Sequence, residues 1–270
     1  MRPLIPQSLP ASIPAIGASA SRIRTFRRRG LLGAALAAPA LLAPRRAAAT
    51  EAVDVELILA VDVSRSVDAQ EQALQFAGYA NAFRDRRLAE GIAGGPVGAI
   101  AVCFFTWSDW DIQNLLVPWT RVDGRESAEG FAAAIDAAPR ETFLYTSISG
   151  AIEYASRLFG QRYEGTRQVV DISGDGVNNS GRSLAEARQA ALDRGIVLNG
   201  LAVLDRDPTP NAVLAGLPPL DEYYRDEVIG GPGAFLMVAE GFEAFDTAVR
   251  RKIIREIAAA PPPGPLVERA

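Results

Sequence analysis

An aspartate and two serines at alternate positions are the residues whose types and spacing best suit chemistry. Asp62, Ser64 and Ser66 directly follow the apolar residues 55–61, a run typical of a buried strand. A loop at the carboxyl end of that strand would hold one carboxylate and two hydroxyls together, and such oxygen ligands suit Mg²⁺, Mn²⁺ or Ca²⁺. The pattern alone is weak, because strand-to-helix turns use Asp and Ser in the same way to bond backbone amides.

Two more segments are expected to bring similar groups to this loop. Asp175 follows residues 168–173, an apolar run expected to lie beside the first strand, and Thr146 begins the helix before that run. In a doubly wound sheet, ligands collect beyond the carboxyl ends of the strands. We therefore expect one divalent-cation site built from three separate segments. Its predicted ligands are Asp62, Ser64, Ser66, Thr146 and Asp175.

Two of these positions have competitors nearby. Thr146 could serve only as a helix N-cap, with Thr142 or Ser147 as the true ligand. Asp175 could belong to a plain Asp-Gly turn, and Asp171 lies nearby inside the strand pattern. We favour Thr146 and Asp175, because both stand at the expected edge of the sheet.

Three neighbouring features are expected to surround the site or support it. Asn178 and Asn179 are typical turn formers that are close enough to line it. Residues 107–111, Trp-Ser-Asp-Trp-Asp, suit either an aromatic and acidic binding loop or a hairpin corner with a partly buried tryptophan, which we favour. Arg65 is expected to point to solvent or toward the acidic rim of a ligand.

Apolar runs alternate with segments of helical period along most of the chain, which indicates an α/β fold. We expect a doubly wound, mostly parallel six-stranded sheet, with one antiparallel edge strand at residues 114–119 and helices on both faces. Residues 217–232 are expected to form a loop that could include one helical turn. The other expected strands are 53–61, 97–106, 168–173, 196–204 and 235–239, and the expected helices are 69–86, 125–137, 147–159, 184–194 and 242–258.

The chain resembles the von Willebrand factor A fold and its metal-ion-dependent adhesion site over residues 53–258. The resemblance rests on Asp62-Val63-Ser64-Arg65-Ser66, on Thr146 and on Ser173-Gly174-Asp175-Gly176, as well as on the order of elements. Residues 169–179 and 228–235 more closely resemble a bacterial family of exported A-type domains without an assigned biochemical function. One departure is Ser-Gly-Asp-Gly at the fourth strand, where many A domains have Thr-Asp-Gly.

The resemblance implies that the serines and the threonine supply hydroxyl ligands, while the aspartates bind the cation directly or through water. Neutral hydroxyls quench a divalent charge poorly, so that an open coordination position stays electrophilic. An Asp or Glu carboxylate from a partner protein would complete the coordination shell. We expect Mg²⁺ in preference to Mn²⁺ or Ca²⁺.

Composition and charge exclude several other classes of function. Residues 1–49 contain eight arginines and no acidic residue, so the remaining chain has 20 basic and 32 acidic residues and a net charge of −12. Such a surface disfavours nucleic acid and anionic membranes as partners. The chain has no histidine, and Lys252 is its only lysine. The one cysteine, Cys103, is expected to be a buried small hydrophobe, so no disulfide forms within the chain.

The first 49 residues have the layout of an export signal. Arg28 and Arg29 precede Gly-Leu-Leu and a short apolar run, and residues 47–49 provide an Ala-x-Ala cleavage site near Ala49. The paired arginines resemble a twin-arginine signal, with a general secretory signal as the alternative. The thirteen-residue apolar run is too short to span a bilayer. We therefore expect a periplasmic or secreted domain at residues 50–258, followed by a disordered proline-rich tail at 259–270.

Three functions compete on this evidence. The leading hypothesis is a metal-dependent protein-binding module, and not an enzyme. The second is a divalent-metal phosphatase or hydrolase, which is disfavoured because the chain has no histidine and no nucleophile paired with a base. The third is a structural domain with a vestigial metal site.

Overall fold

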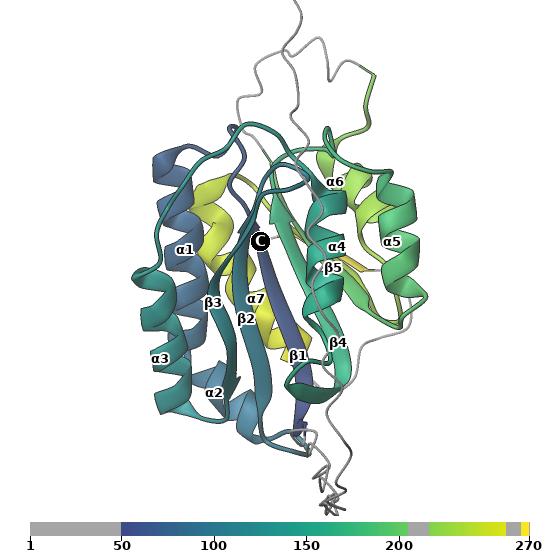
Figure 1. The fold of residues 1–270 in the computed structure, drawn as a ribbon. Helices are drawn as coiled ribbons and strands as arrows, with labels where there is room; N and C mark the ends of the chain where they lie inside the picture. The colour runs from purple at the N-terminus through teal and green to yellow at the C-terminus, as the bar shows by residue number, and fades with distance from the viewer. Residues whose placement is uncertain (1–49, 205–215, 258–265, 270) are drawn as a thin grey trace, which may run out of the picture. The chain divides into compact units, whose positions relative to one another are not determined.

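The computed structural model describes residues 50–204, 216–257 and 266–269. These residues form one sheet with helices on both faces (Figure 1). The strands are β1 (Glu51–Asp62), β2 (Ile100–Trp107), β3 (Gln113–Val122), β4 (Tyr163–Gly174), β5 (Val197–Val203), β6 (Phe235–Ala239) and β7 (Leu266–Arg269). The helices are α1 (Ala69–Arg84), α2 (Arg86–Ala93), α3 (Arg125–Asp136), α4 (Ile148–Leu158), α5 (Leu184–Leu192), α6 (Leu220–Tyr223) and α7 (Phe245–Ile257).

The strands follow the order β3-β2-β1-β4-β5-β6-β7, with β1 at the point where the winding direction reverses. Only β3 runs antiparallel to its neighbour, β2. The predicted doubly wound, mostly parallel sheet with an antiparallel edge strand is therefore confirmed. The carboxyl ends of β1 and β4 lie side by side, since Val61 pairs with Ser173. This register brings the two loops that carry the predicted ligands together.

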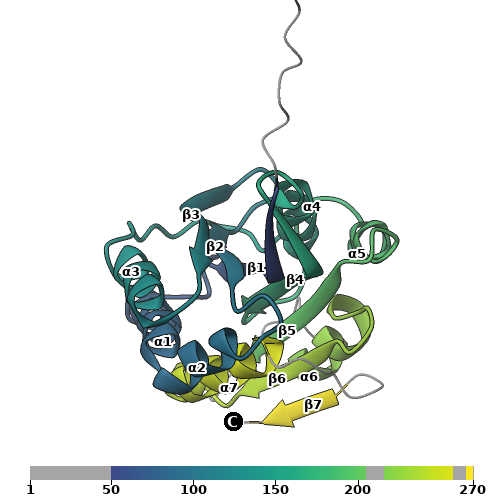
Figure 2. The same ribbon diagram turned by 90° about the horizontal axis from the view of Figure 1, so that it is seen from below.

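Residues of β1 alternate between two hydrophobic cores, as expected for a central strand covered on both faces. Leu57 and Leu59 pack in the core beneath α1, α2, α3 and α7. Ile58 and Ala60 pack in the core beneath α4 and α5. Figure 2 shows the two helical layers on either side of the sheet. Cys103 is buried in the second core, and burial raises the pKa of its thiol, which confirms the expected structural role.

Local capping explains where the first helices begin. Asp68 caps α1 by accepting hydrogen bonds from the backbone of Gln70 and Glu71, and Glu71 bonds back to the Asp68 amide. The predicted helix over residues 69–86 is confirmed as α1, which ends two residues earlier because Asp85 adopts an extended conformation and caps a second helix, α2. No helix is predicted from the sequence for residues 87–93, where α2 lies.

Two corrections concern the second half of the chain. Residues 217–232, predicted as a loop that could include one helical turn, hold such a turn as α6 and, beyond it, a π-helical turn at Tyr224–Val228. The predicted disordered tail is wrong for β7, which pairs in parallel with β6 and makes the sheet seven-stranded instead of six-stranded. The rest of the predicted tail, residues 259–265 and 270, lies outside the described residues.

A cluster of charged groups is buried between α7 and the sheet. Lys252 Nζ lies 2.6 Å from Asp171 Oδ1 and 2.6 Å from Glu256 Oε1, and both Lys252 and Asp171 have no solvent exposure. Asn199 donates to Glu256 Oε1 at 3.0 Å and accepts from the Phe235 amide. Burial, with a smaller effect of the Glu256 charge, raises the pKa of Asp171 to about 7, although Lys252 lowers it.

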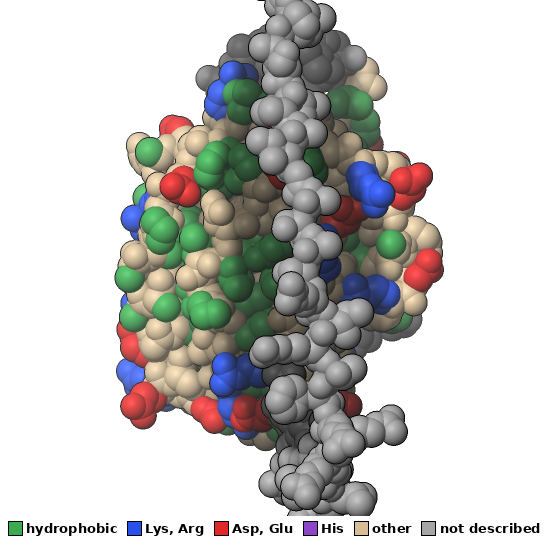
Figure 3. Space-filling view, in the orientation of Figure 1, with side chains coloured by type: hydrophobic (Ala, Val, Ile, Leu, Met, Phe, Trp, Pro, Cys, Tyr) green, Lys and Arg blue, Asp and Glu red, His purple; other side chains and the backbone are tan. Residues whose placement is uncertain are grey.

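The surface charges and the lengths of the described helices indicate how the protein could meet nucleic acid or a membrane. On the face drawn in Figure 3, acidic and basic side chains of the described residues are interspersed and do not form one basic patch. Each helix in the described ranges is too short or too polar to cross a bilayer. The export signal predicted for residues 1–49 lies outside the described residues and stays a prediction.

Candidate metal site

The loop after β1 has the compact geometry that its residue types suggest. Asp62 is fully buried, and its Oδ1 accepts a hydrogen bond of 2.7 Å from the backbone amide of Ser64. The Ser64 and Ser66 hydroxyls lie 3.2 Å apart. The turn closes where the Val67 amide donates to the Ser64 carbonyl at 3.0 Å. The carboxylate and both hydroxyls therefore stand together at the carboxyl end of β1.

The loop after β4 brings the second carboxylate to the same place. The Ser66 hydroxyl donates a hydrogen bond of 2.7 Å to Asp175 Oδ1, although 109 residues separate the two positions. This contact follows from the pairing of β1 with β4, which places both strand ends at one edge of the sheet. Asp171, the alternative to Asp175, lies in the charged cluster with Lys252 instead.

Thr146 reaches the site from the segment before α4. Its side chain is almost fully buried, and a Cβ atom at Gly176 would lie 3.4 Å from its hydroxyl oxygen. Of the alternatives to Thr146, Thr142 is exposed to solvent. Ser147 is the N-cap of α4, since its hydroxyl accepts from the Gly150 amide. The structure therefore places Thr146 beside Gly176, next to Asp175, whereas the Ser147 hydroxyl contacts the same loop further along, at Ser180.

Two asparagines hold the Thr146 segment in position. The Asn179 side chain accepts a hydrogen bond of 2.9 Å from the Thr146 amide, and the Asn179 amide donates to the Thr146 carbonyl at 2.8 Å. The Asn178 side chain accepts from the Ser149 amide at 2.9 Å. Sequence reasoning predicted turn formers here, but not that their side chains fasten the β4–α5 loop to the start of α4.

The buried carboxylate of Asp62 has surroundings that suit a bound cation. Burial raises the pKa of the Asp62 carboxyl well above its usual range, and the charge of Asp175 raises it further, while hydrogen bonds from Ser64 lower it. Asp62 Oδ2 is buried without a hydrogen-bond partner. A buried carboxylate oxygen without a donor is unfavourable unless positive charge approaches it, so these residues suit a divalent cation.

The donor set is mixed. The described residues contain no group of three or more histidine, cysteine, aspartate or glutamate side chains that could hold a metal ion. A cation bound here would therefore depend on hydroxyls as well as on the two carboxylates. Hard cations such as Mg²⁺, Mn²⁺ and Ca²⁺ accept such oxygen ligands.

Tyr224 lies beneath the site and was missed by the sequence analysis. It is fully buried, its hydroxyl has no hydrogen-bond partner, and burial raises the pKa of its phenol, as do the charges of Asp62 and Asp175. A Cβ atom at Gly174 would lie 2.7 Å from the Tyr224 oxygen and 2.9 Å from Asp62 Oδ2. Glycine at this position therefore lets the phenol pack against the strand end beside the carboxylate.

A cavity of about 250 Å³ opens above these residues. Leu144 on its wall is 52% exposed, and the next residue, Tyr145, is 48% exposed. Arg65 also lines the cavity and is exposed, in agreement with the expectation that it faces solvent. The cavity walls are formed by Arg65, Ser66, Leu144, Thr146, Asp175, Gly176, Val177 and Asn179.

The tryptophan-rich segment at residues 107–111 forms the corner between β2 and β3. Trp107 is fully buried in the core beneath α4, whereas Trp110 is 62% exposed. The Asp109 carboxylate accepts a hydrogen bond from the Ser180 hydroxyl and so joins the corner to the β4–α5 loop. The predicted hairpin corner is therefore confirmed, with Trp107 buried in the core and Trp110 exposed to solvent.

Solved structures with similar folds include three proteins from different sources. No curated protein sequence matches the chain. Proximal thread matrix protein 1 (PTMP1) from the mussel byssus, with a zinc-occupied MIDAS motif, is 16% identical with a TM-score of 0.50. The pilus adhesin SpaC from Lactobacillus rhamnosus GG is 14% identical with a TM-score of 0.53. The von Willebrand factor type A protein from Catenulispora acidiphila is 13% identical with a TM-score of 0.51.

Each comparison covers 76% of this chain, but only 46%, 31% and 43% of the three proteins, in the same order. The chain therefore spans less than half the length of each of these three structures. At these identities the likeness establishes the fold, and the resemblance to von Willebrand factor A domains is confirmed. Residues 52–261 match a family described as "Protein of unknown function (DUF1194)", and the chain belongs to that family.

Proposed function

We propose that this protein is an exported, divalent-cation-dependent module that binds a protein partner through an acidic side chain. The observation that carries the proposal is the Ser66–Asp175 contact of 2.7 Å beside the buried, unpartnered Asp62 oxygen. These residues come from two loops that only the fold brings together. The proposed ligands are Asp62, Ser64, Ser66, Thr146 and Asp175, with Mg²⁺ as the first choice of cation.

The residues of the site explain why the partner would supply a carboxylate. A divalent cation held largely by neutral hydroxyls retains positive charge at an open position. Arg65 lies exposed on the wall of the same cavity and adds a positive charge beside it. The net charge of −12 over residues 50–270 would repel an acidic partner at long range. The attraction is therefore local and dependent on the cation.

A hydrolase or phosphatase is the second candidate, and the chain supplies fewer of the groups that such an enzyme needs. The only lysine, Lys252, is fully buried and ion-paired, so it is not available as a surface base or nucleophile. The chain has no histidine for general base catalysis. A structural domain with a vestigial site is the third candidate, and it predicts that the fold does not respond to metal.

The proposed location is the periplasm or the exterior of the cell, reached through the twin-arginine-type signal with cleavage near Ala49. SpaC from Lactobacillus rhamnosus GG, which has a similar fold, is a pilus adhesin. The observation on this chain itself is the run of Arg28, Arg29, an apolar segment and an Ala-x-Ala site. We propose that no part of the chain stays inserted in a membrane after cleavage.

Thermal unfolding with and without metal tests the site. Binding to the folded state alone contributes RT ln(1 + [L]/Kd), or about 2.7 kcal/mol at a hundredfold excess over Kd. For a domain of this size, that free energy raises the melting temperature by about 5–11 °C. The Asp62→Ala variant should lose this rise with Mg²⁺ and with Mn²⁺.

The exposed Asp111 of the β2–β3 corner offers a matched control. Asp111→Ala removes a neighbouring carboxylate outside the proposed ligand set and should keep the full response to metal. An Asp62→Ala protein that responds to Mg²⁺ as the wild type does would refute the site. Hydrolysis of aryl phosphates or esters that requires both Mn²⁺ and Asp62 would favour the enzyme instead.

A further inference from the structure

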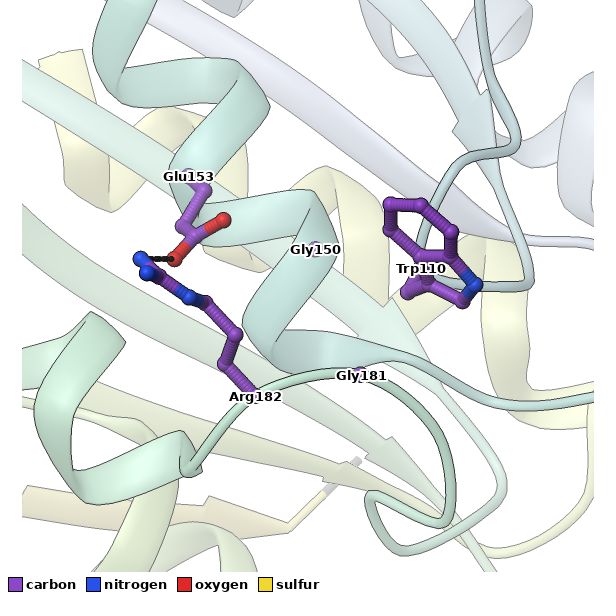
Figure 4. Close-up of a pocket in the computed structure, with 5 residues that line it drawn as sticks. All are labelled: Trp110, Gly150, Glu153, Gly181 and Arg182. Carbon is purple, nitrogen blue, oxygen red and sulfur yellow. Dashed lines mark hydrogen bonds and ion pairs between the residues drawn. The ribbon is translucent and has the colours of Figure 1, made fainter.

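A second cavity lies beside the first and takes no part in the proposed cation site. It has a volume of about 500 Å³, within the usual range of ligand pockets. Figure 4 shows Trp110 on one side of it and the paired Glu153 and Arg182 side chains on the other. Gly150 and Gly181 lie between them and present no side chain to the cavity.

The two cavities share a wall. Asn179 lines the first cavity and Gly181 lines the second, and Cα atoms two residues apart are separated by at most about 7.6 Å. Thr146 and Gly150 make the same connection across the start of α4. One bound molecule can therefore reach both cavities across a single short ridge.

Hydrogen bonds fix this ridge before any ligand arrives. The Ser147 hydroxyl donates to the Ser180 carbonyl at 2.9 Å, and the Ser147 amide donates to the Ser108 carbonyl at 2.6 Å. A Cβ atom at Gly181 would lie 2.6 Å from the Ser147 hydroxyl oxygen, so the loop packs directly onto the start of α4. A preformed wall lowers the entropic cost of binding a ligand that spans it.

The chemistry of the second cavity differs from that of the first. Glu153 and Arg182 form an ion pair of 3.1 Å, so their charges cancel at the cavity wall. Trp110 is 62% exposed, the highest exposure among the large hydrophobic side chains of the described residues. A neutral cavity with an open indole face favours an uncharged apolar or aromatic side chain.

Chain geometry sets the spacing of such a ligand. In an extended peptide, alternate side chains point the same way and each residue advances about 3.3 Å. Side chains two or four residues apart therefore lie about 7 or 13 Å apart on one side of the peptide. These lengths suit two cavities that share a wall of two residues.

We propose that the partner docks as an extended segment in which an acidic side chain enters the cation site and an apolar or aromatic side chain, two or four residues away, enters the Trp110 cavity. This inference rests on the proposed function, because the acidic residue is held at the cation site. In this proposal the second cavity, which Trp110 lines, determines which partner sequence is bound, and the cation site makes binding dependent on metal.

Selection of displayed peptides tests the inference. Random peptides with one fixed aspartate are bound to the full-length protein in Mg²⁺ and eluted with EDTA. The enriched sequences should carry Phe, Trp, Leu, Ile or Met two or four positions from the aspartate. A synthesised hit should bind Trp110→Ala about tenfold more weakly than wild type, because truncation of a central aromatic contact typically costs this much.

Two controls separate the possible failures. Val97→Ala changes an exposed apolar residue before β2, at the opposite edge of the sheet, and should leave peptide binding unchanged. Trp110→Ala should keep the rise in melting temperature with Mg²⁺, which shows that its cation site is intact. Hits without an apolar preference, or equal binding to Trp110→Ala and wild type, would overturn the inference alone. A Mg²⁺ response without any EDTA-eluted peptide would overturn carboxylate docking as well, and no Mg²⁺ response would overturn the cation site itself.

Discussion

Replacement of Lys252 by methionine should destabilise the fold strongly. Methionine keeps most of the length of the lysine side chain but removes the only positive charge within 2.6 Å of Asp171 and Glu256. Both carboxylates stay buried, at 0% and 2% exposure. The variant therefore tests what the buried charged cluster contributes, with little change in packed volume.

The expected loss follows from the number of charges left unpaired. Removal of one partner from a buried ion pair typically costs about 3–5 kcal/mol, because the remaining charge has neither water nor a counterion. Here two carboxylates lose the same ammonium group, so we expect the upper part of that range. For a domain of this size, a loss of about 4–5 kcal/mol lowers the melting temperature by about 8–20 °C.

Urea unfolding followed by circular dichroism at about pH 8 and about pH 5 measures the loss and its origin. The pKa of Asp171 is about 7 in the wild type, and Lys252 is a group that lowers it, so a proton can neutralise Asp171 in the variant at about pH 5. The deficit of the variant should therefore be largest at about pH 8 and smaller at about pH 5. Arg86→Met is the control, since the Arg86–Glu90 pair of 3.4 Å is exposed and should contribute less than about 0.5 kcal/mol. A loss below about 1 kcal/mol in Lys252→Met, or one independent of pH, would refute the reasoning.

Three other predictions concern Asp171, Gly174 and the N-terminus of the mature protein. The pKa of Asp171 is about 7 in the folded protein and 3.8 in the unfolded chain, so the folded state binds more protons between about pH 4 and about pH 7. The free energy of unfolding of the wild type, measured by urea titration relative to Asp171→Asn, should therefore increase as the pH falls from about 7 to about 4. Gly174→Ala should lower the free energy of unfolding by about 1–3 kcal/mol and weaken Mg²⁺ binding in calorimetry, because its Cβ would meet the Tyr224 and Asp62 oxygens, whereas Gly130→Ala, with nothing within 4 Å, should not. N-terminal sequencing of protein from the producing cell should begin close to Thr50, and an intact N-terminus would contradict export.

The central sheet could be predicted because both of its faces are buried. Each parallel strand therefore appears as a near-continuous apolar run, which alternation with helices separates clearly. The position of Asp175 beside the Asp62 loop followed from the rule that parallel strand ends meet at one edge of a doubly wound sheet. The contact from Ser66 to Asp175 at 2.7 Å agrees with that reasoning. Metal binding at this place stays a prediction.

Other features had no local signal in the sequence. The break between α1 and α2 depends on one extended residue, Asp85, inside a segment whose spacing still suits a helix. Tyr224 belongs to a stretch rich in proline and glycine, and only the packed structure places it under Asp62. β7 follows a proline-rich stretch and finds its partner, β6, through tertiary pairing. Such features depend on contacts between distant segments, which periodicity does not report.

The burial of the only lysine has a practical consequence for chemical labelling. Amine-reactive reagents such as succinimidyl esters require an accessible, uncharged amine, and Lys252 Nζ lies between two carboxylates beneath α7. Within the described residues the folded domain therefore offers no lysine to acylate. The rate at which Lys252 is acylated, followed by mass spectrometry, would instead report how often α7 separates from the sheet at this position. Acylation of this single buried amine would thus measure local opening of the domain without an added label.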